Sequence, residues 1–197
     1  MKKILHVISS PRSGESVSLK LGNAIIDKLL TAYPGSTVTT KDLRHLPHVN
    51  EKHIAAFFTP ADAWTPENEE AIRYSNEAIQ AIWDADILVI GAPMYNFSIP
   101  SSLKAWLDQI VRVGVTFKPG ATGIEGLITG KKVYLAVASG WVYSEGPMKE
   151  YDFVVPYLQR ILSTIGMNDI TVIRAEGVNR PETKVGAFER AVDSIVL

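Results

Sequence analysis

The centre of the chain carries an apolar run, because residues 86–92 (DILVIGA) are apolar from Ile87 onward. Parallel strands covered on both faces read as continuous apolar runs, whereas half-exposed strands alternate. The segment Asp86–Ala92 therefore predicts a strand buried inside a parallel sheet. Ile87–Ala92 and Val133–Ala138 are the longest apolar stretches, far short of the ~18–20 residues that cross a bilayer. No membrane segment is expected.

Short runs of this kind alternate with longer segments of helical period. Strands are expected at Ile4–Ile8, Thr37–Lys41, Asp86–Ala92, Lys132–Ser139 and Ile170–Arg174. Helices are expected around apolar stripes that run from Gly22 to Tyr33, from Ile72 to Trp83, from Leu103 to Val111, from Tyr157 to Ile165 and from Val185 to Ile195. Leu43–Trp64 lacks a period and is expected to be irregular. Five strands alternating with five helices predict an α/β fold, a doubly wound parallel sheet.

Composition narrows the class of protein. The 197 residues include 20 Lys+Arg and 21 Asp+Glu, for a net charge of -1, and no cysteine. This length predicts one domain over residues 1–197. The balanced charge gives no sign of the excess of basic residues that is typical of nucleic-acid-binding domains. The lack of cysteine excludes disulfides and thiolate metal sites and fits a cytoplasmic protein. Lys2-Lys3 and the apolar run after them resemble a signal peptide, but the run is too short and is interpreted as the first strand.

A loop rich in hydroxyls follows the first strand and opens into a helix. Residues 9–18 (SSPRSGESVS) hold five serines, and their backbone amides precede a helix N-terminus. Helix-end amides and hydroxyls can together bind a phosphate dianion. The alternative is that Ser16 only caps the helix. No G-x-G-x-x-G, Walker or G-x-S-x-G motif is present, so the loop suits a cofactor phosphate better than phosphate cleavage.

A second loop, Gly91–Pro100, follows the central strand and holds an aromatic, an amide, a second aromatic and a thioether between two prolines. Such groups can pack against a flat heteroaromatic ring and bond to its edge. The alternative is a structural loop in which Asn96 supports a turn. His45, His48 and His53 gather earlier in the chain, but their spacing matches no metal motif, and no metal site is expected.

These motifs and others in the same order resemble the FMN-dependent NADH-azoreductase (NADH:quinone oxidoreductase) family of flavodoxin-like proteins. The matching pieces are Ser9-Ser10, Ser16–Ser18, Ala92–Pro100, Gly114–Phe117, Glu125–Leu127, Thr129–Lys132, Glu145–Pro147, Pro156–Leu158 and Ala175–Gly177. They span the whole chain. The resemblance implies a flavodoxin-like sheet with strand order 2-1-3-4-5.

The resemblance also implies an FMN site made of three loops. Its residues would be Ser10, Ser16, Val17 and Ser18 at the FMN phosphate, Met94, Tyr95, Asn96 and Phe97 along the isoalloxazine, and Ser139, Gly140, Trp141 and Val142 over the pyrimidine side. The last stretch departs from the family's usual Ser-Arg-Gly-Gly, because Gly140 and Trp141 replace an arginine and a glycine. A cation near the flavin is therefore not expected from this loop.

The implied activity is reduction of quinones and aromatic azo compounds by NADH or NADPH. The nicotinamide would pass a hydride to N5 of FMN, and the acceptor would then occupy the same face, a ping-pong scheme that needs no catalytic side chain. A flavodoxin-type electron carrier is the alternative, although such carriers are typically strongly acidic. A phosphohydrolase would need an acid pair with a metal, or a nucleophile beside a base, and neither is found.

A homodimer with active sites across the interface is also expected. Several aromatics lie at or beyond the ends of expected elements: Trp64, Trp106, Phe117, Tyr143, Tyr151 and Phe153. One five-stranded sheet need not bury all of them, and apolar surface patches usually mark an interface. The expected contact is formed by Trp106, Ile110 and Val113 with the segment to Phe117.

Overall fold

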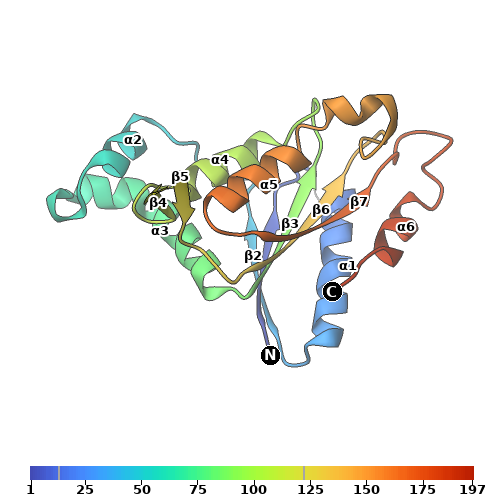
Figure 1. Cartoon of the computed structure of the whole chain (residues 1–197), viewed down its shortest axis with the longest axis horizontal. Helices are drawn as coiled ribbons and strands as arrows, with labels where there is room; N and C mark the ends of the chain where they lie inside the picture. The colour runs from blue at the N-terminus through green and yellow to red at the C-terminus, as the bar shows by residue number, and fades with distance from the viewer. Residues whose placement is uncertain (13, 122) are drawn as a thin grey trace.

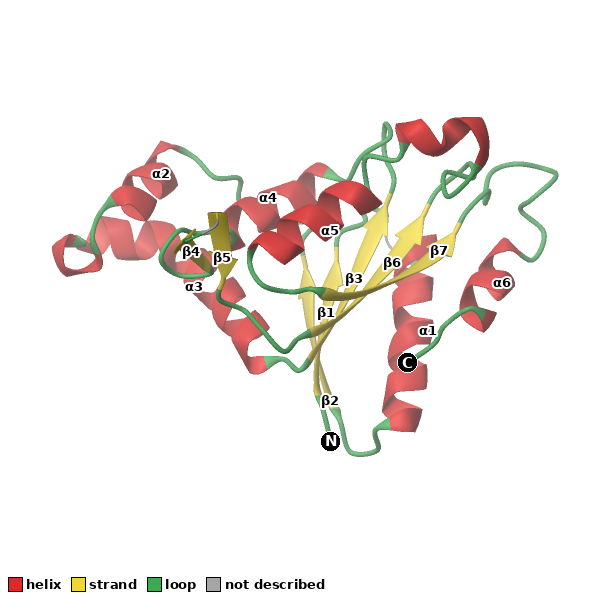
Figure 2. Ribbon diagram, viewed as in Figure 1, coloured by secondary structure: helices red, strands yellow, loops and turns green. Residues whose placement is uncertain are grey.

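The computed structural model describes residues 1–12, 14–121 and 123–197. Five parallel strands form its twisted central sheet (Figures 1 and 2). They are β1 (Lys3–Ile8), β2 (Thr37–Asp42), β3 (Ile87–Pro93), β6 (Lys132–Ala138) and β7 (Asp169–Ala175), in the spatial order β2-β1-β3-β6-β7. Numbered within this sheet, the order is 2-1-3-4-5. The winding reverses between β1 and β3, which makes their carboxyl ends the place to look for a ligand.

Helices cover both faces of the sheet, as the doubly wound pattern requires. One face packs against α1 (Val17–Ala32) and α6 (Ala187–Asp193). The other packs against α3 (Pro66–Asp84), α4 (Ser101–Ile110) and α5 (Val155–Thr164). Every residue of β3 is buried, which explains its continuous apolar sequence.

The helix starts follow from capping chemistry. The Ser16 hydroxyl accepts the Leu19 amide at the start of α1. Thr65 and Asn68 form a reciprocal capping box at α3, with Pro66 in its first turn. These side chains satisfy amides that have no partner inside the helix, which explains why α1 and α3 begin at these residues.

The segment 43–64 is not irregular throughout, contrary to the expectation. It contains α2 (Glu51–Phe58) and a short 3-10 helix, Ala61–Ala63. Asn50 accepts amides of the first turn, and the His53 ring accepts the Asn50 amide in return. A histidine at the third helical position is an unusual partner in a capping box, so the start signal was missed.

Three further expectations need correction. An antiparallel hairpin, β4 (Phe117–Gly120) with β5 (Gly123–Gly126), lies outside the main sheet and was not expected. Trp83 is 40% exposed instead of buried. Ile79 and Ile82 form the face of α3 that packs into the core, and Trp83 lies outside that face. The last helix begins at Ala187, after a left-handed Gly186, and leaves Val185 exposed.

In the part of the chain that the structure describes, no helix combines the length and the apolarity that a bilayer crossing demands.

Candidate functional site

The loops after β1, β3, β6 and β7 meet at the carboxyl edge of the sheet (Figure 2). A pocket of about 290 Å³ lies among these loops. Its walls are Ser10, Arg12, Glu15, Ser16, Val17, Ser18, Pro93, Met94, Tyr95, Ala138, Ser139, Gly140, Val178 and Asn179. The reversal of strand order beside β1 opens this crevice, as in other open α/β sheets.

One wall of the pocket is the N-terminus of α1. The Ser10, Ser16 and Ser18 side chains are buried, and the Ser16 and Ser18 hydroxyls lie 3.1 Å apart. Among the described residues, the Val17 and Ser18 amides have no acceptor, since the first backbone bond of the helix comes from its fourth residue, Lys20, and the Ser16 hydroxyl takes the Leu19 amide. Free amides and hydroxyls at a helix N-terminus form a site for an anion.

Two charged side chains border this wall. Arg12 lines the pocket, and its backbone amide donates to the Ser10 hydroxyl over 3.2 Å. Glu15 also lines the pocket, but its carboxylate pairs with Lys20 at 3.3 Å. The pairing offsets part of the negative charge, so the N-terminus of α1 keeps its preference for anions. Ser13 of this loop lies outside the described residues.

A tight turn after β3 forms the opposite wall. Tyr95 and Ser98 exchange two backbone hydrogen bonds of 2.9 and 3.0 Å around Asn96 and Phe97, whose φ angles are +48° and +69°. Two left-handed central residues define a type I′ turn, which asparagine tolerates and which glycine normally completes. A phenylalanine in this conformation is strained, and such strain persists only where surrounding contacts hold it.

The contacts that hold Phe97 come from the segment after β6. The Phe97 ring packs edge-on against Tyr143, with centroids 6.3 Å apart, and lies tilted against Tyr151, with centroids 5.3 Å apart. The Phe153 amide donates to the Phe97 carbonyl over 3.1 Å. Burial raises the pKa of Tyr143, so its phenol stays neutral in this cluster. The turn is therefore built by tertiary contacts as well as by its own bonds.

The loop after β6 folds onto the loop after β7. The Ser139 hydroxyl donates to the Trp141 carbonyl over 2.8 Å, and the Asn179 amide donates to the Gly140 carbonyl over 3.2 Å. A Cβ on Gly140 would stand only 2.9 Å from the Asn179 side-chain nitrogen, so the glycine permits this close approach. Trp141 is 46% exposed, and the Arg180 guanidinium lies 4.4 Å from its ring centroid. A cation therefore lies beside Trp141, but it comes from the loop after β7 and not from the loop after β6.

The pocket brings together most of the residues expected to bind a cofactor. Those that line it are Ser10, Ser16, Val17, Ser18, Met94, Tyr95, Ser139 and Gly140. Asn96, Phe97, Trp141 and Val142 belong to the same loops but lie outside the lining. Arg12, Val178 and Asn179 were not expected. The sequence signal for the last two is Gly177, which follows the end of β7 at the same edge of the sheet and has a positive φ.

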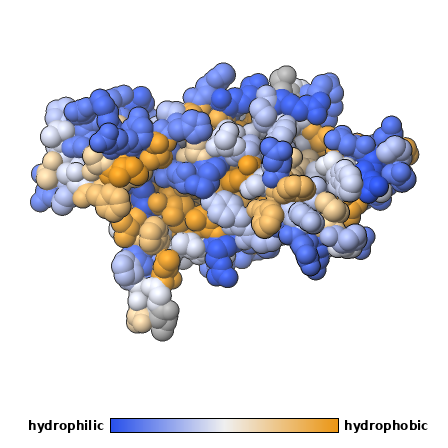
Figure 3. All heavy atoms as spheres, turned by 90° about the horizontal axis from the view of Figure 1, so that it is seen from above, coloured by the Kyte–Doolittle hydropathy of each residue, from blue (hydrophilic) through white to orange (hydrophobic). Residues whose placement is uncertain are grey.

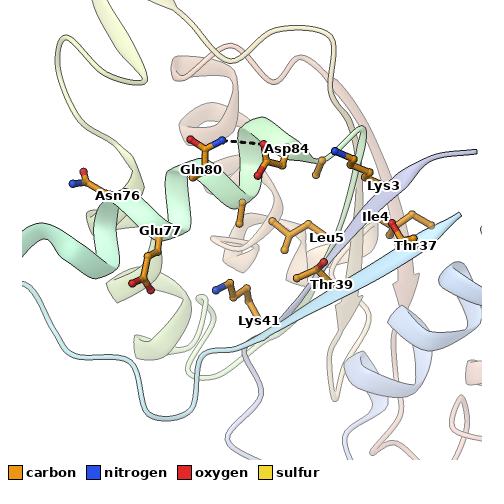
Figure 4. A pocket seen from close by; sticks show the side chains of 12 residues that line it. Lys3, Ile4, Leu5, Thr37, Thr39, Lys41, Asn76, Glu77, Gln80 and Asp84 are labelled. Atoms are coloured by element: carbon orange, nitrogen blue, oxygen red, sulfur yellow. Dashed lines mark hydrogen bonds between the residues drawn. The ribbon is translucent and has the colours of Figure 1, made fainter.

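Larger hollows occur away from the carboxyl edge of the sheet. One of about 560 Å³ lies between α3 and the edge of the sheet, beside Lys3, Ile4 and Leu5 at the amino end of β1 (Figure 4). Figure 4 shows the Gln80 amide turned to Asp84, to which it donates over 2.9 Å. This hollow lies away from the carboxyl ends of β1 and β3, so it is a weaker candidate for the ligand site than the pocket at the switch point.

The histidines of the segment 43–64 form no metal site in the described residues, where no group of three or more metal-ligating side chains gathers. His53 instead belongs to the capping box of α2, where its Nδ1 accepts the Asn50 backbone amide over 3.3 Å.

Comparison with known proteins identifies the family. Residues 2–196 match the family described as a flavodoxin-like fold. The FMN-dependent NADH:quinone oxidoreductase of Herminiimonas arsenicoxydans is 48% identical over 180 residues, 90% of this chain and 88% of the relative. The chain belongs to this flavodoxin-like family of FMN-dependent NADH:quinone oxidoreductases.

Further relatives extend the match over the whole chain. An FMN-dependent NADH:quinone oxidoreductase 1 from Rhizobium etli is 41% identical and covers 100% of this chain and 99% of its own length. The crystal structure of an azoreductase from Bacillus anthracis superposes with a TM-score of 0.89 at 31% identity, covering 98% of this chain and 96% of that one. The resemblance inferred from the loop motifs is confirmed, and this family member shares the azoreductase fold.

Proposed function

We propose that the chain, as one flavodoxin-like domain over residues 1–197, is an FMN-dependent oxidoreductase that uses NADH or NADPH to reduce quinones and aromatic azo compounds. The observation that carries the proposal is the pocket at the switch point, where free amides of α1 and buried hydroxyls face the Tyr95 turn. The names of the relatives support the same substrates. A cytoplasmic location remains a prediction from the sequence.

The residues present suit FMN. The phosphate would accept from the Ser10, Ser16 and Ser18 hydroxyls and from the Val17 and Ser18 amides. Met94 and Tyr95, with the adjoining Asn96-Phe97 turn, would lie along the ring system, and the segment from Ser139 to Val142 would close its far side. FMN supplies the two-electron redox chemistry when bound, and the chain supplies binding and orientation. No side chain is assigned as a nucleophile or a metal ligand.

Steady-state kinetics test the proposal against the electron-carrier alternative. The purified protein, loaded with FMN, is expected to oxidise NADH continuously with a small quinone as the acceptor and without a protein partner. If one pocket serves donor and acceptor in turn, double-reciprocal plots at several quinone concentrations will be parallel. Intersecting lines would refute the shared pocket, and turnover only with a redox protein would favour the carrier.

We further propose a homodimer, on evidence from the face formed by α2 and the end of α4. Phe58 is 77% exposed, Val113 50% and Ile54 47%, and they border a groove of about 500 Å³. Figure 3 shows apolar side chains gathered over the part of the molecule where α2, α4 and the β4–β5 hairpin lie in Figure 1. A second copy would cover this surface.

The expected contact residues need revision. Trp106 and Ile110 are buried in the core, because α4 turns its apolar face toward the sheet, and only Val113 and Phe117 of that set reach the groove. The groove also contains Arg112, whose guanidinium donates to Asn76 over 2.6 Å and lies over the Phe57 ring.

Sedimentation equilibrium of the FMN-loaded protein tests the dimer. The wild-type protein is expected to sediment as a dimer at micromolar concentration. Phe58→Glu with Val113→Glu is expected to give monomers, because two charges would be buried in an apolar contact. Val185→Glu is the matched control, since Val185 is equally exposed but lies before α6. A wild-type monomer would contradict the proposal.

A further inference from the structure

One partly buried guanidinium joins two of the segments that surround the candidate flavin pocket. Arg174 lies near the end of β7, with 20% of its side chain exposed. Its Nη2 donates to Asp152 Oδ2 over 2.6 Å, and its Nη1 donates to Glu176 Oε1 over 3.2 Å. The two carboxylates are more buried still, with 6% and 10% of their side chains exposed. The proposed chemistry assigns no task to this cluster.

Asp152 connects the cluster to the segment that supports Phe97. Its other oxygen, Oδ1, accepts the Val154 and Val155 amides over 3.0 and 3.1 Å at the start of α5, where the N-cap residue has no side-chain bond of its own. The next residue, Phe153, donates its amide to the Phe97 carbonyl. The 3-10 helix Gly146–Tyr151, which lies above the carboxyl ends of β3 and β6 in Figure 1, ends directly before Asp152.

Glu176 connects the cluster to the second support. Its Oε1 accepts the Tyr143 amide over 2.9 Å, and the Tyr143 ring packs edge-on against Phe97. Thus each carboxylate held by Arg174 is tied to a contact of Phe97. Asp152 precedes Phe153 and bonds the two residues after it, and Glu176 bonds the Tyr143 amide directly. Phe97 is the bulky residue in the left-handed conformation that needs such support.

We propose that Arg174 is a positioning residue for the flavin-facing turn: by clamping Asp152 and Glu176, it holds Phe153 and Tyr143 where they keep the Tyr95–Ser98 turn in its strained form. The inference rests on the proposed function, because it requires that the turn contacts the ring system of bound FMN. A guanidinium suits the task, since its planar fork reaches two carboxylates in fixed directions. A lysine ammonium is a point charge and lacks this geometry.

The affinities for FMN and riboflavin distinguish a positioning role of Arg174 from a role in binding the phosphate. Arg174→Met and Arg174→Lys should weaken the binding of FMN and of riboflavin by the same factor, roughly tenfold, because the turn contacts the ring that both share. The ratio of the two dissociation constants should stay at its wild-type value. Affinities are measured by quenching of flavin fluorescence on titration with apoprotein, and circular dichroism confirms that each variant is folded.

Relief of the strain provides a second readout. Phe97→Gly removes the need for support, because glycine adopts positive φ without cost. In this background Arg174→Met should no longer change riboflavin affinity beyond error, whereas a general loss of stability would act in both backgrounds. Arg73→Met is the matched control, since Arg73 also bridges two carboxylates, Glu70 and Glu77, but on the exposed face of α3. It should leave both affinities unchanged.

The outcomes are distinct. If wild-type apoprotein binds no flavin, the proposed function fails. If it binds FMN but the Arg174 variants bind both flavins as tightly as wild type, or lose only FMN, the positioning role is wrong. Should Arg174→Met not fold, Glu176→Gln decides by the same ratio, because glutamine still accepts the Tyr143 amide but no longer forms the ion pair.

Discussion

Apoprotein is expected to bind FMN about a thousand times more tightly than riboflavin. The two flavins differ only in the phosphate, which the proposed site would place against the hydroxyls and free amides at the start of α1. A hydrogen bond to a charged group contributes about 1.5–3 kcal/mol, and each 1.4 kcal/mol is tenfold in affinity. Two or three such bonds therefore give roughly a thousandfold preference. Titration of apoprotein with both flavins measures it.

Serine variants test whether the preference for FMN over riboflavin comes from the N-terminus of α1. Ser16→Ala combined with Ser18→Ala should reduce FMN affinity and leave riboflavin affinity unchanged, with a loss of about 1 kcal/mol of stability from the missing cap. Thr65→Ala is the matched control, because it removes an equivalent cap from α3 without touching the pocket. Equal affinity of the wild-type protein for the two flavins would remove the basis for the phosphate assignment.

The second large effect is a loss of stability in acid caused by His6. This residue is buried in β1, its Nε2 has no hydrogen-bond partner among the described residues, and burial lowers its pKa from 6.5 to about 4. Between these values the unfolded chain binds a proton that the folded chain excludes. The free energy of unfolding should therefore fall as the pH drops from 6.5 toward 4, by up to about 3 kcal/mol from this residue.

Denaturant unfolding at pH 7 and at pH 5 checks this prediction. His6→Leu should make the difference in unfolding free energy between the two pH values smaller by about 2 kcal/mol. Ile4→Val, in the same strand, is the control: it lowers stability by loss of a buried methyl group but titrates nothing, so the difference should match wild type. An unchanged pH dependence in His6→Leu would show that the histidine is not excluded from protonation.

Local sequence patterns were sufficient for the main sheet because its strands and helices follow simple periods. The buried run in β3 and the cap signals at Ser16 and Thr65 are determined by neighbours in the sequence. The α2 helix was missed because its capping box uses a histidine. The β4–β5 hairpin was missed because it is short, and Gly126 packs against the Gly166 backbone, a contact between distant residues.

The candidate site was likewise predictable only in part from the sequence. Loops after strands one, three and four were predictable, since ligands bind at the carboxyl ends of parallel strands. The contribution of Asn179 depends on Gly140, and the position of Arg180 depends on Trp141, so both need the folded loops side by side. The Arg174 cluster joins β7 to residues more than twenty positions away, and no spacing rule predicts it.

The most direct test of the account is the visible spectrum of the FMN-loaded protein during anaerobic titration with NADH. The account predicts a flavin absorption band that remains with the protein after gel filtration, is bleached by stoichiometric NADH and returns when a quinone is added. A protein that retains no flavin, or whose bound flavin stays oxidised in excess NADH and NADPH, would contradict it.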